Sequence, residues 1–202
     1  MRRHTGVVIV VALGAALAFA AVAVAGTVRG TQGDDVLTGT EGPDTIVAKK
    51  GDDQADGLGE ADKIFGSRGS DELDGGDGDD RLWGGADDDQ LVAGAGDDTA
   101  RGKGGADDLD GGDGNDFLNG GKNADQVDAG AGDDVVRSRG DGKAADTITC
   151  GDGNDTVFAD RNDVVAGDCE TVKRTGRQNQ SSQGGKGKGN GPEKKSPHAP
   201  QS

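Results

Sequence analysis

The strongest constraint on this chain is a nine-residue period that begins at Gly30. Cut into rows of nine from there to Arg137, with two more rows from Asp141 to Phe158, the sequence gives 14 rows. The sixth position is Asp in all 14, the fourth is Gly in ten, and the eighth is Val, Ile or Leu in 12. Ser138-Arg139-Gly140 reads as a three-residue insertion. A fixed period of this kind predicts a stacked repeat fold and argues against random low complexity.

Odd and even rows differ in their first six positions. Even rows from Gly75 onward always have Gly at positions two and four and Asp or Asn at position five. Odd rows place basic residues there instead, namely Lys49, Lys50, Arg68, Lys103, Lys122 and Lys143. This alternation predicts a coil of two rows, with odd and even turns on opposite edges. Two explanations remain for the odd edge. Either the Lys and Arg side chains of the chain partly replace bound metal ions there, or the odd rows are degenerate repeats with weaker metal-binding sites.

The rows resemble the hemolysin-type (repeats-in-toxin) nonapeptide, G-G-x-G-x-D-x-U-x, where U is a large aliphatic residue. The resemblance covers Gly30–Phe158. It implies an all-β parallel β-roll, a β-solenoid of about seven coils of about 18 residues each. It also implies that the first six positions form a turn and that x-U-x is a short strand with U inward. Ca²⁺ would then lie between turns of neighbouring coils, held by Asp carboxylates and backbone carbonyls.

The residue types support calcium chemistry independently of the resemblance. Gly permits tight turns and lets carbonyl groups approach an ion, and Asp is a short, hard anionic ligand that suits Ca²⁺. We expect the main ligands on the even edge, at Asp80, Asp98, Asp116, Asp134 and Asp155. Further candidates at the same row position are Asp44, Asp62, Asp71, Asp89, Asp107 and Asp125.

Stacking these rows without a cation is unfavourable. Neighbouring coils would bring Asp above Asp at about 4.8 Å, a repulsion of about 3.5 kcal/mol per pair at an effective dielectric near 20. One inward aliphatic residue per row offers little apolar burial to offset it. Because a divalent cation between the carboxylates reverses the sign of this interaction, the sequence predicts that calcium decides whether the chain folds.

Charge and composition restrict the function classes. Residues 30–172 contain 12 Lys and Arg against 37 Asp and Glu, and neither His nor Tyr. A stretch this acidic repels phosphates and anionic lipid, so we expect no nucleic-acid partner. We also expect no enzyme, since the period already explains the carboxylates as metal ligands. The predicted function is a secreted calcium-binding repeat protein. The alternative is a structural or adhesive cell-surface spacer.

Residues 1–25 are predicted to be a signal peptide. Arg2 and Arg3 precede an apolar segment from Gly6 to Ala25, and Ala23-Val24-Ala25 supplies small residues before Gly26. Cleavage there would give an extracellular protein without stable membrane association. The alternative is a retained anchor, because about 20 apolar residues can span a bilayer.

The C-terminal part carries three further expectations. Cys150 and Cys169 are the only cysteines, and an exported chain would join them in a disulfide; the alternative is two free thiols. After the roll at 26–158, residues 159–172 would form a cap in which Val164, Val165 and Val172 cover the open end. Residues 173–202 read as a disordered basic tail, which either touches anionic cell-wall polymers or only keeps the protein soluble.

Overall fold

The computed structural model describes residues 11–12, 26–139 and 144–174. Within these ranges the chain forms strands and turns, and no helix there is long and apolar enough to cross a membrane. Apart from Val11 and Ala12, the predicted signal peptide lies outside the described residues, as does the predicted tail from residue 175 onward.

The strands follow one another along the chain at intervals of about one row. Their bounds are β1 Val11–Ala12, β2 Thr27–Arg29, β3 Asp35–Thr40, β4 Thr45–Lys50, β5 Gln54–Leu58, β6 Lys63–Arg68, β7 Glu72–Asp77, β8 Arg81–Trp83, β9 Gln90–Ala95, β10 Thr99–Gly104, β11 Asp108–Asp113, β12 Phe117–Lys122, β13 Gln126–Asp128, β14 Val135–Ser138, β15 Thr147–Thr149, β16 Thr156–Ala159, β17 Val164–Val165 and β18 Thr171–Arg174.

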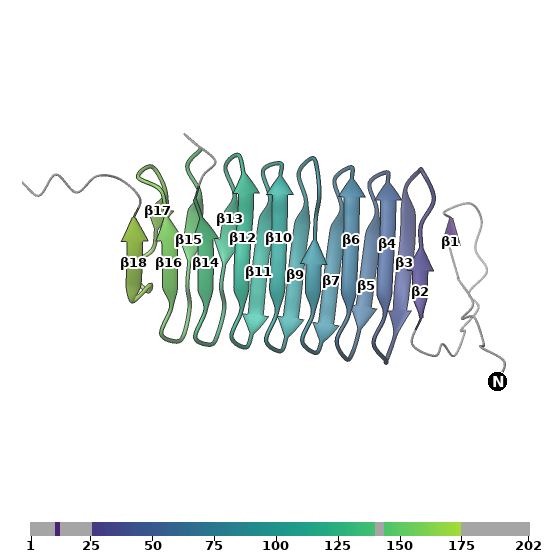
Figure 1. Cartoon of the computed structure of the whole chain (residues 1–202), viewed down its shortest axis with the longest axis horizontal. Coiled ribbons are helices and arrows are strands. Elements are labelled where there is room, and N and C mark those ends of the chain that lie inside the picture. The colour runs from purple at the N-terminus through teal and green to yellow at the C-terminus, as the bar shows by residue number, and fades with distance from the viewer. Residues whose placement is uncertain (1–10, 13–25, 140–143, 175–202) are drawn as a thin grey trace, which may run out of the picture.

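Odd- and even-numbered strands form two separate nine-stranded sheets, here called sheet A (odd) and sheet B (even). Figure 1 shows them as two layers joined by turns along both long edges, with β2 near one end of the roll and β18 at the other. Each strand pairs in parallel with the strand one coil later, as in Leu91↔Leu109↔Val127, a spacing of 18 residues. The predicted all-β parallel roll and its 18-residue coil are therefore confirmed. The antiparallel pairing of β1 with β3 is the one departure among the described strands.

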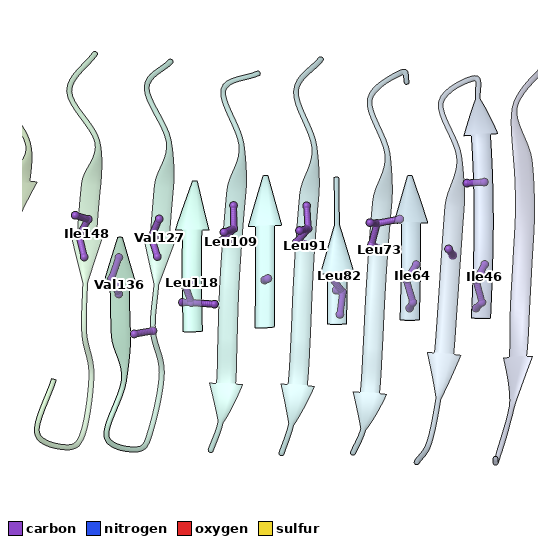
Figure 2. Packing of buried hydrophobic residues seen from close by; sticks show 14 of the residues in the cluster. Ile46, Ile64, Leu73, Leu82, Leu91, Leu109, Leu118, Val127, Val136 and Ile148 are labelled. Carbon is purple, nitrogen blue, oxygen red and sulfur yellow. The ribbon is translucent and has the colours of Figure 1, made fainter. Parts of the chain in front are cut away.

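The core is a single file of aliphatic side chains between the sheets. Every eighth-position residue from Leu37 to Val157 is at most 4% exposed, including the two alanines Ala55 and Ala100. Figure 2 shows side chains of this set, among them Leu82, Leu91 and Leu109, between the two layers of strands. Burying one Leu, Ile or Val contributes about 1.5–3 kcal/mol, so each row gains little from its core residue.

The strands are longer than the predicted three residues. In β11, for example, the three strand positions of one row continue through the first three positions of the next, and exposed and buried residues alternate over the first four of the six. The first position of a row therefore also points inward. It is occupied in the core by Ala48, Ala93, Ala129 and Cys150, and elsewhere mostly by Gly.

The insertion was predicted to begin at Ser138, and this is wrong by one residue. Ser138 belongs to β14 and pairs with Ala159 of β16, so it occupies the first position of its row. The additional residues therefore lie in the turn that follows, and the register from β13 to β15 becomes 21 residues, as in Val127↔Ile148. Residues 140–143 of this turn lie outside the described ranges.

The roll extends beyond the recognisable repeats at both ends. β2 pairs with β4 before the first complete row, and β17 and β18 pair with β15 and β16 after the last one. These additions bring the solenoid to about eight turns, close to the expected seven. Of the three valines expected to cover the open end, Val165 packs against the core, whereas Val164 is 61% and Val172 39% exposed. The predicted disulfide is present between Cys150 and Cys169.

Candidate metal centre

The sixth-position aspartates form two continuous ladders, one along each edge of the roll. Each backbone N–H donates to Oδ1 of the Asp one coil later, as from Asp98 to Asp116 and from Asp116 to Asp134, both at 2.8 Å. The odd edge repeats the pattern, with Asp89 donating to Asp107 at 3.0 Å. These carboxylates are buried although they are acidic; Asp116, for example, is 2% exposed. One carboxylate oxygen per rung is thus used to align neighbouring coils.

The second carboxylate oxygen is the notable one, because in the central rungs it is buried without a hydrogen-bond partner. This holds for Oδ2 of Asp53, Asp62, Asp71, Asp80, Asp89, Asp98, Asp107, Asp116, Asp134 and Asp155. A buried anionic oxygen without a donor is strongly destabilising unless a cation or a proton compensates it.

Rungs near the ends satisfy Oδ2 with the chain's own donors. Oδ2 of Asp44 accepts from the Thr40 backbone N–H at 2.6 Å, and Oδ2 of Asp163 accepts from that of Asp160 at 2.5 Å. Oδ2 of Asp146 accepts from the Ser138 hydroxyl. The unsatisfied oxygens therefore belong mainly to the central coils and to Asp155.

Burial raises the pKa of the central carboxyl groups. Burial first, and then the like charges of the adjacent rungs, raise the pKa of Asp98 and of Asp116 to about 7. The same causes raise the pKa of Asp89 on the odd edge to about 7. Backbone N–H donation from the neighbouring rung lowers the pKa only partly in each case. The ladder charges are thus poorly compensated by the protein on both edges.

The donor set fits a hard divalent cation. An unpartnered carboxylate oxygen lies near a backbone oxygen of the next coil: an added Cβ on Gly111 would meet Oδ2 of Asp116 at 2.6 Å and also the Ala129 carbonyl oxygen of the next coil. Carboxylate and carbonyl oxygens are the ligands that Ca²⁺ prefers. When bound, the ion would supply the positive charge that the buried Oδ2 atoms lack.

Side chains alone do not complete such a site. Among the described residues, the only group of at least three potential ligands within 4.8 Å of one another is Cys150, Asp168 and Cys169. Its two sulfur atoms are bonded to each other, so neither is available as a thiolate. A cation at the ladders therefore depends on backbone carbonyls from the glycine turns in addition to the carboxylates.

The turns of the two edges share a backbone conformation with positive φ, but the strain of this conformation differs between the edges. On the even edge, Gly112 and Gly114 have φ of +92° and +133°, in the left-handed region. On the odd edge the second position holds Lys49 and Lys103 at φ of +94° and +81°, which is strained for residues with a side chain. The Lys49 ammonium donates to the Gly30 carbonyl oxygen of the preceding coil, so a chain cation takes up a backbone oxygen on that edge.

A second, exposed ladder runs along the even edge at the fifth position. Oδ1 of Asp97 accepts from the Asn115 backbone N–H at 2.8 Å, and Oδ1 of Asn115 accepts from that of Asp133 at 2.8 Å. On the odd edge the equivalent positions include Ser70 and Ala106, whose N–H groups donate to Oδ1 of Asp52 and of Asp88. Neither residue has a carboxylate or amide oxygen that could continue the ladder to the next rung. The even turns are therefore the more regular of the two.

The structure brings the predicted ligand candidates together as two series, one per edge. Asp44, Asp62, Asp80, Asp98, Asp116, Asp134 and Asp155 stack along the even edge, and Asp71, Asp89, Asp107 and Asp125 along the odd edge. Sequence reasoning missed Asp163 and Glu170, which accept from Asp146 and Asp155 respectively. Asp163 is followed by two valines, as in a row that is shortened by one residue. This pattern is not visible when the sequence is cut strictly into rows of nine.

Comparison with protein families identifies the repeat. Four copies of the RTX calcium-binding nonapeptide repeat match residues 29–64, 65–100, 101–136 and 141–165. The chain belongs to the RTX calcium-binding nonapeptide repeat family. The gap between the last two RTX copies coincides with the longer turn after Ser138. A search of curated proteins found no match.

Membership in the RTX repeat family, together with the regularly spaced buried aspartates, indicates a Ca²⁺-binding β-roll. The first three RTX copies each cover two coils, since the sheet registers give one coil for every 18 residues. The family thus implies calcium as the partner of the ladders described above.

Proposed function

We propose that this RTX repeat chain is a secreted protein that folds when Ca²⁺ binds between its stacked Gly/Asp turns. The observation that carries the proposal is the row of buried Oδ2 atoms without donors in the central rungs. Without a cation these oxygens oppose stacking, and with one they hold neighbouring coils together. Binding free energy then becomes folding free energy. The ligands we propose are the even-edge aspartates from Asp80 to Asp155, with the odd-edge series as weaker sites.

Far-UV circular dichroism of the purified chain tests this proposal. In chelator at pH 8 and low salt we expect an unfolded spectrum, and we expect β signal to appear on calcium addition with a midpoint of about 10⁻⁴–10⁻³ M, as in other extracellular modules. Trp83, half-buried and stacked on Phe65, offers a fluorescence signal for the same transition. Magnesium at equal concentration is the control. Full β structure in excess chelator at pH 8 would contradict the proposal.

Export and the absence of catalysis are parts of the same proposal. Cleavage before Gly26 would remove β1 and leave a chain whose first described strand, β2, starts at Thr27. N-terminal sequencing of the mature protein distinguishes this from a retained anchor. A non-enzymatic role is supported by the ladder, which accounts for the buried carboxylates as structural and metal-binding groups.

A second candidate is a stiff surface spacer, favoured by the single-file stack of coils in Figure 1. Under this alternative the basic segment 173–202 would anchor the roll to anionic cell-wall polymers. Cell fractionation separates the two: the protein is found in the culture medium under the first proposal and in the envelope under the second.

A further inference from the structure

The two outer faces of the roll carry opposite charges. We call face A the seventh- and ninth-position side chains of the sheet A strands β3–β17, and face B those of the sheet B strands β2–β18. Among the described residues, face A has no Lys or Arg and face B has no Asp or Glu. The charged residues of face A are Asp56, Glu72, Asp74, Asp108, Asp110 and Asp128. Those of face B are Arg29, Lys63, Arg81, Arg101, Arg137 and Lys173.

Aromatic rings contact three of the face B cations, namely Arg101, Arg137 and Lys173. Every aromatic residue in the described ranges lies on this face, at Phe65, Trp83, Phe117 and Phe158. The Arg137 guanidinium lies 5.1 Å from the Phe117 ring centroid and 5.7 Å from that of Phe158. Such cation–π contacts fix long side chains before a partner arrives, which lowers the entropy lost on binding.

In the part of the chain that the structure describes, no Lys or Arg of face A offsets its anions. Both side chains are exposed, but partial desolvation against the sheet and then the like charge of Asp56 raise the pKa of Asp74, and partial desolvation and then Asp128 raise that of Asp110. Positive charge brought against face A by a partner would therefore stabilise its carboxylates.

The charged residues of the two faces also recur at the same spacing. Strands in both sheets are about 4.8 Å apart, so the rows of charge on face A and on face B have the same spacing. A partner that stacks flat sugar rings or bases needs exposed ring faces. The rings of Phe65 and Trp83 instead cover each other, with centroids 4.4 Å apart and planes inclined by 2°. The surface with matching charge and matching repeat is face A of another copy.

We propose that face B of one copy docks on face A of a second copy. The proposal goes beyond calcium binding and rests only on the folded roll. Nine strands about 4.8 Å apart and three residues wide give roughly 400 Å² per copy, at the low end for specific interfaces. The contact should therefore be weak and salt-sensitive. Because it joins different surfaces on the two copies, it does not close and leads to short linear stacks.

Charge reversal on each face, followed by mixing, tests the proposal. The face B variant carries Lys63→Glu, Arg81→Glu and Arg101→Glu, and the face A variant carries Glu72→Lys, Asp108→Lys and Asp110→Lys; all six residues are exposed. The full chain is studied at the lowest calcium concentration that gives complete β signal. Sedimentation velocity at tens to hundreds of micromolar, with and without 0.5 M NaCl, reports association. Reversal of Lys194 and Lys195 in the tail is the matched control.

We expect concentration-dependent stacks of wild-type and control protein at low salt that dissociate at high salt. Each face variant alone should be monomeric with an unchanged circular dichroism spectrum, and an equimolar mixture of the two should associate again. A folded wild-type protein that is monomeric at all concentrations would overturn the proposal. Binding of an added polyanion such as heparin to face B would not rescue it, because the partner would then not be a second copy. Association that survives reversal of face B would also overturn it, because the tail or bridging calcium would then hold the copies together. If the wild-type protein shows no β signal in calcium, that result would instead contradict the proposed calcium-driven fold.

Discussion

Replacing Asp116 by Asn should have opposite effects on folding with and without calcium. The Asn side chain keeps the Oδ1 atom that accepts from the Asp98 N–H and removes the negative charge on the buried, unpartnered Oδ2. In chelator the variant should therefore be more stable than the wild type. In calcium it should be less stable, because one carboxylate shared by two neighbouring coil–coil gaps is lost.

The magnitude in chelator follows from the raised pKa. Its shift in Asp116 from 3.8 to about 7 corresponds to about 4 kcal/mol disfavouring the folded state at pH 8. A buried amide with incomplete hydrogen bonding costs about 1–3 kcal/mol, so the net gain should be about 1–3 kcal/mol. Since a raised carboxyl pKa opposes folding only when the group is ionised, the gain should vanish at pH 4. In calcium, a loss of about 1–2 kcal/mol would raise the folding midpoint about 5–30-fold.

The matched control is Asp107→Asn on the odd edge. Asp107 has the same ladder hydrogen bonds, and burial raises its pKa to about 6, so its gain in chelator should be smaller. Circular dichroism against trimethylamine N-oxide in chelator, which favours compact states, measures the first effect; calcium titration and bound stoichiometry measure the second. Equal calcium losses in both variants would show that the edges are equivalent. A loss of stability of Asp116→Asn in chelator at pH 8 would refute the charge argument.

Three further outcomes follow from the geometry. In chelator, β signal should increase as pH falls from 8 toward 4, because protonation of carboxyls with pKa of about 6–7, such as those of Asp71 and Asp134, removes their buried charge; a spectrum independent of pH would contradict this. Reducing the Cys150–Cys169 bond, which joins residues 19 apart, should cost about 3 kcal/mol in the chain-entropy model and should raise hydrogen exchange mainly in β15–β18; uniform loss along the roll would argue against a local clamp. Ser138→Ala removes the hydroxyl donor to Asp146 and should cost about 1–3 kcal/mol at pH 8, measured by urea unfolding in calcium against Ser67→Ala, whose side chain is exposed.

Most of the fold was predictable because the period is strict. A sixth-position Asp and an eighth-position aliphatic residue determine which side chains face inward, and alternation of odd and even turns determines the 18-residue coil. The ends were less predictable. Gly26 and Glu170 replace Asp in the ladders, and the register near Asp163 is shortened. There, pairing with an already formed sheet overrides the sequence pattern, since each new strand needs only its neighbour.

Sequence reasoning also missed the second inward position and the separation of charge between faces. The sequence pattern indicates the first position only as part of a turn. In the structure a Cβ on Gly75 would collide with Oδ2 of Asp80 and with the Ala93 carbonyl oxygen, so the carboxylate itself restricts this position to small residues. The charge was treated as an average over residues 30–172. Seventh and ninth positions of alternate rows belong to different sheets, and only the assembled coil shows that cations lie on one face and anions on the other.

The division of labour between the two oxygens of each Asp accounts for the invariance of the sixth position. Oδ1 aligns each coil with the next through a backbone N–H. In the central rungs Oδ2 is buried without a donor, and we propose that a cation compensates it. Asn would preserve the first role and lose the second, whereas Glu is longer and occurs only at the last rung, where Glu170 accepts from the Asp155 N–H at 2.9 Å. The eighth position has one role, to fill the space between the sheets, and it tolerates Ala55 and Ala100. In our proposal the sixth position both sets the register and binds the ion, and it shows no such change in any of the 14 rows.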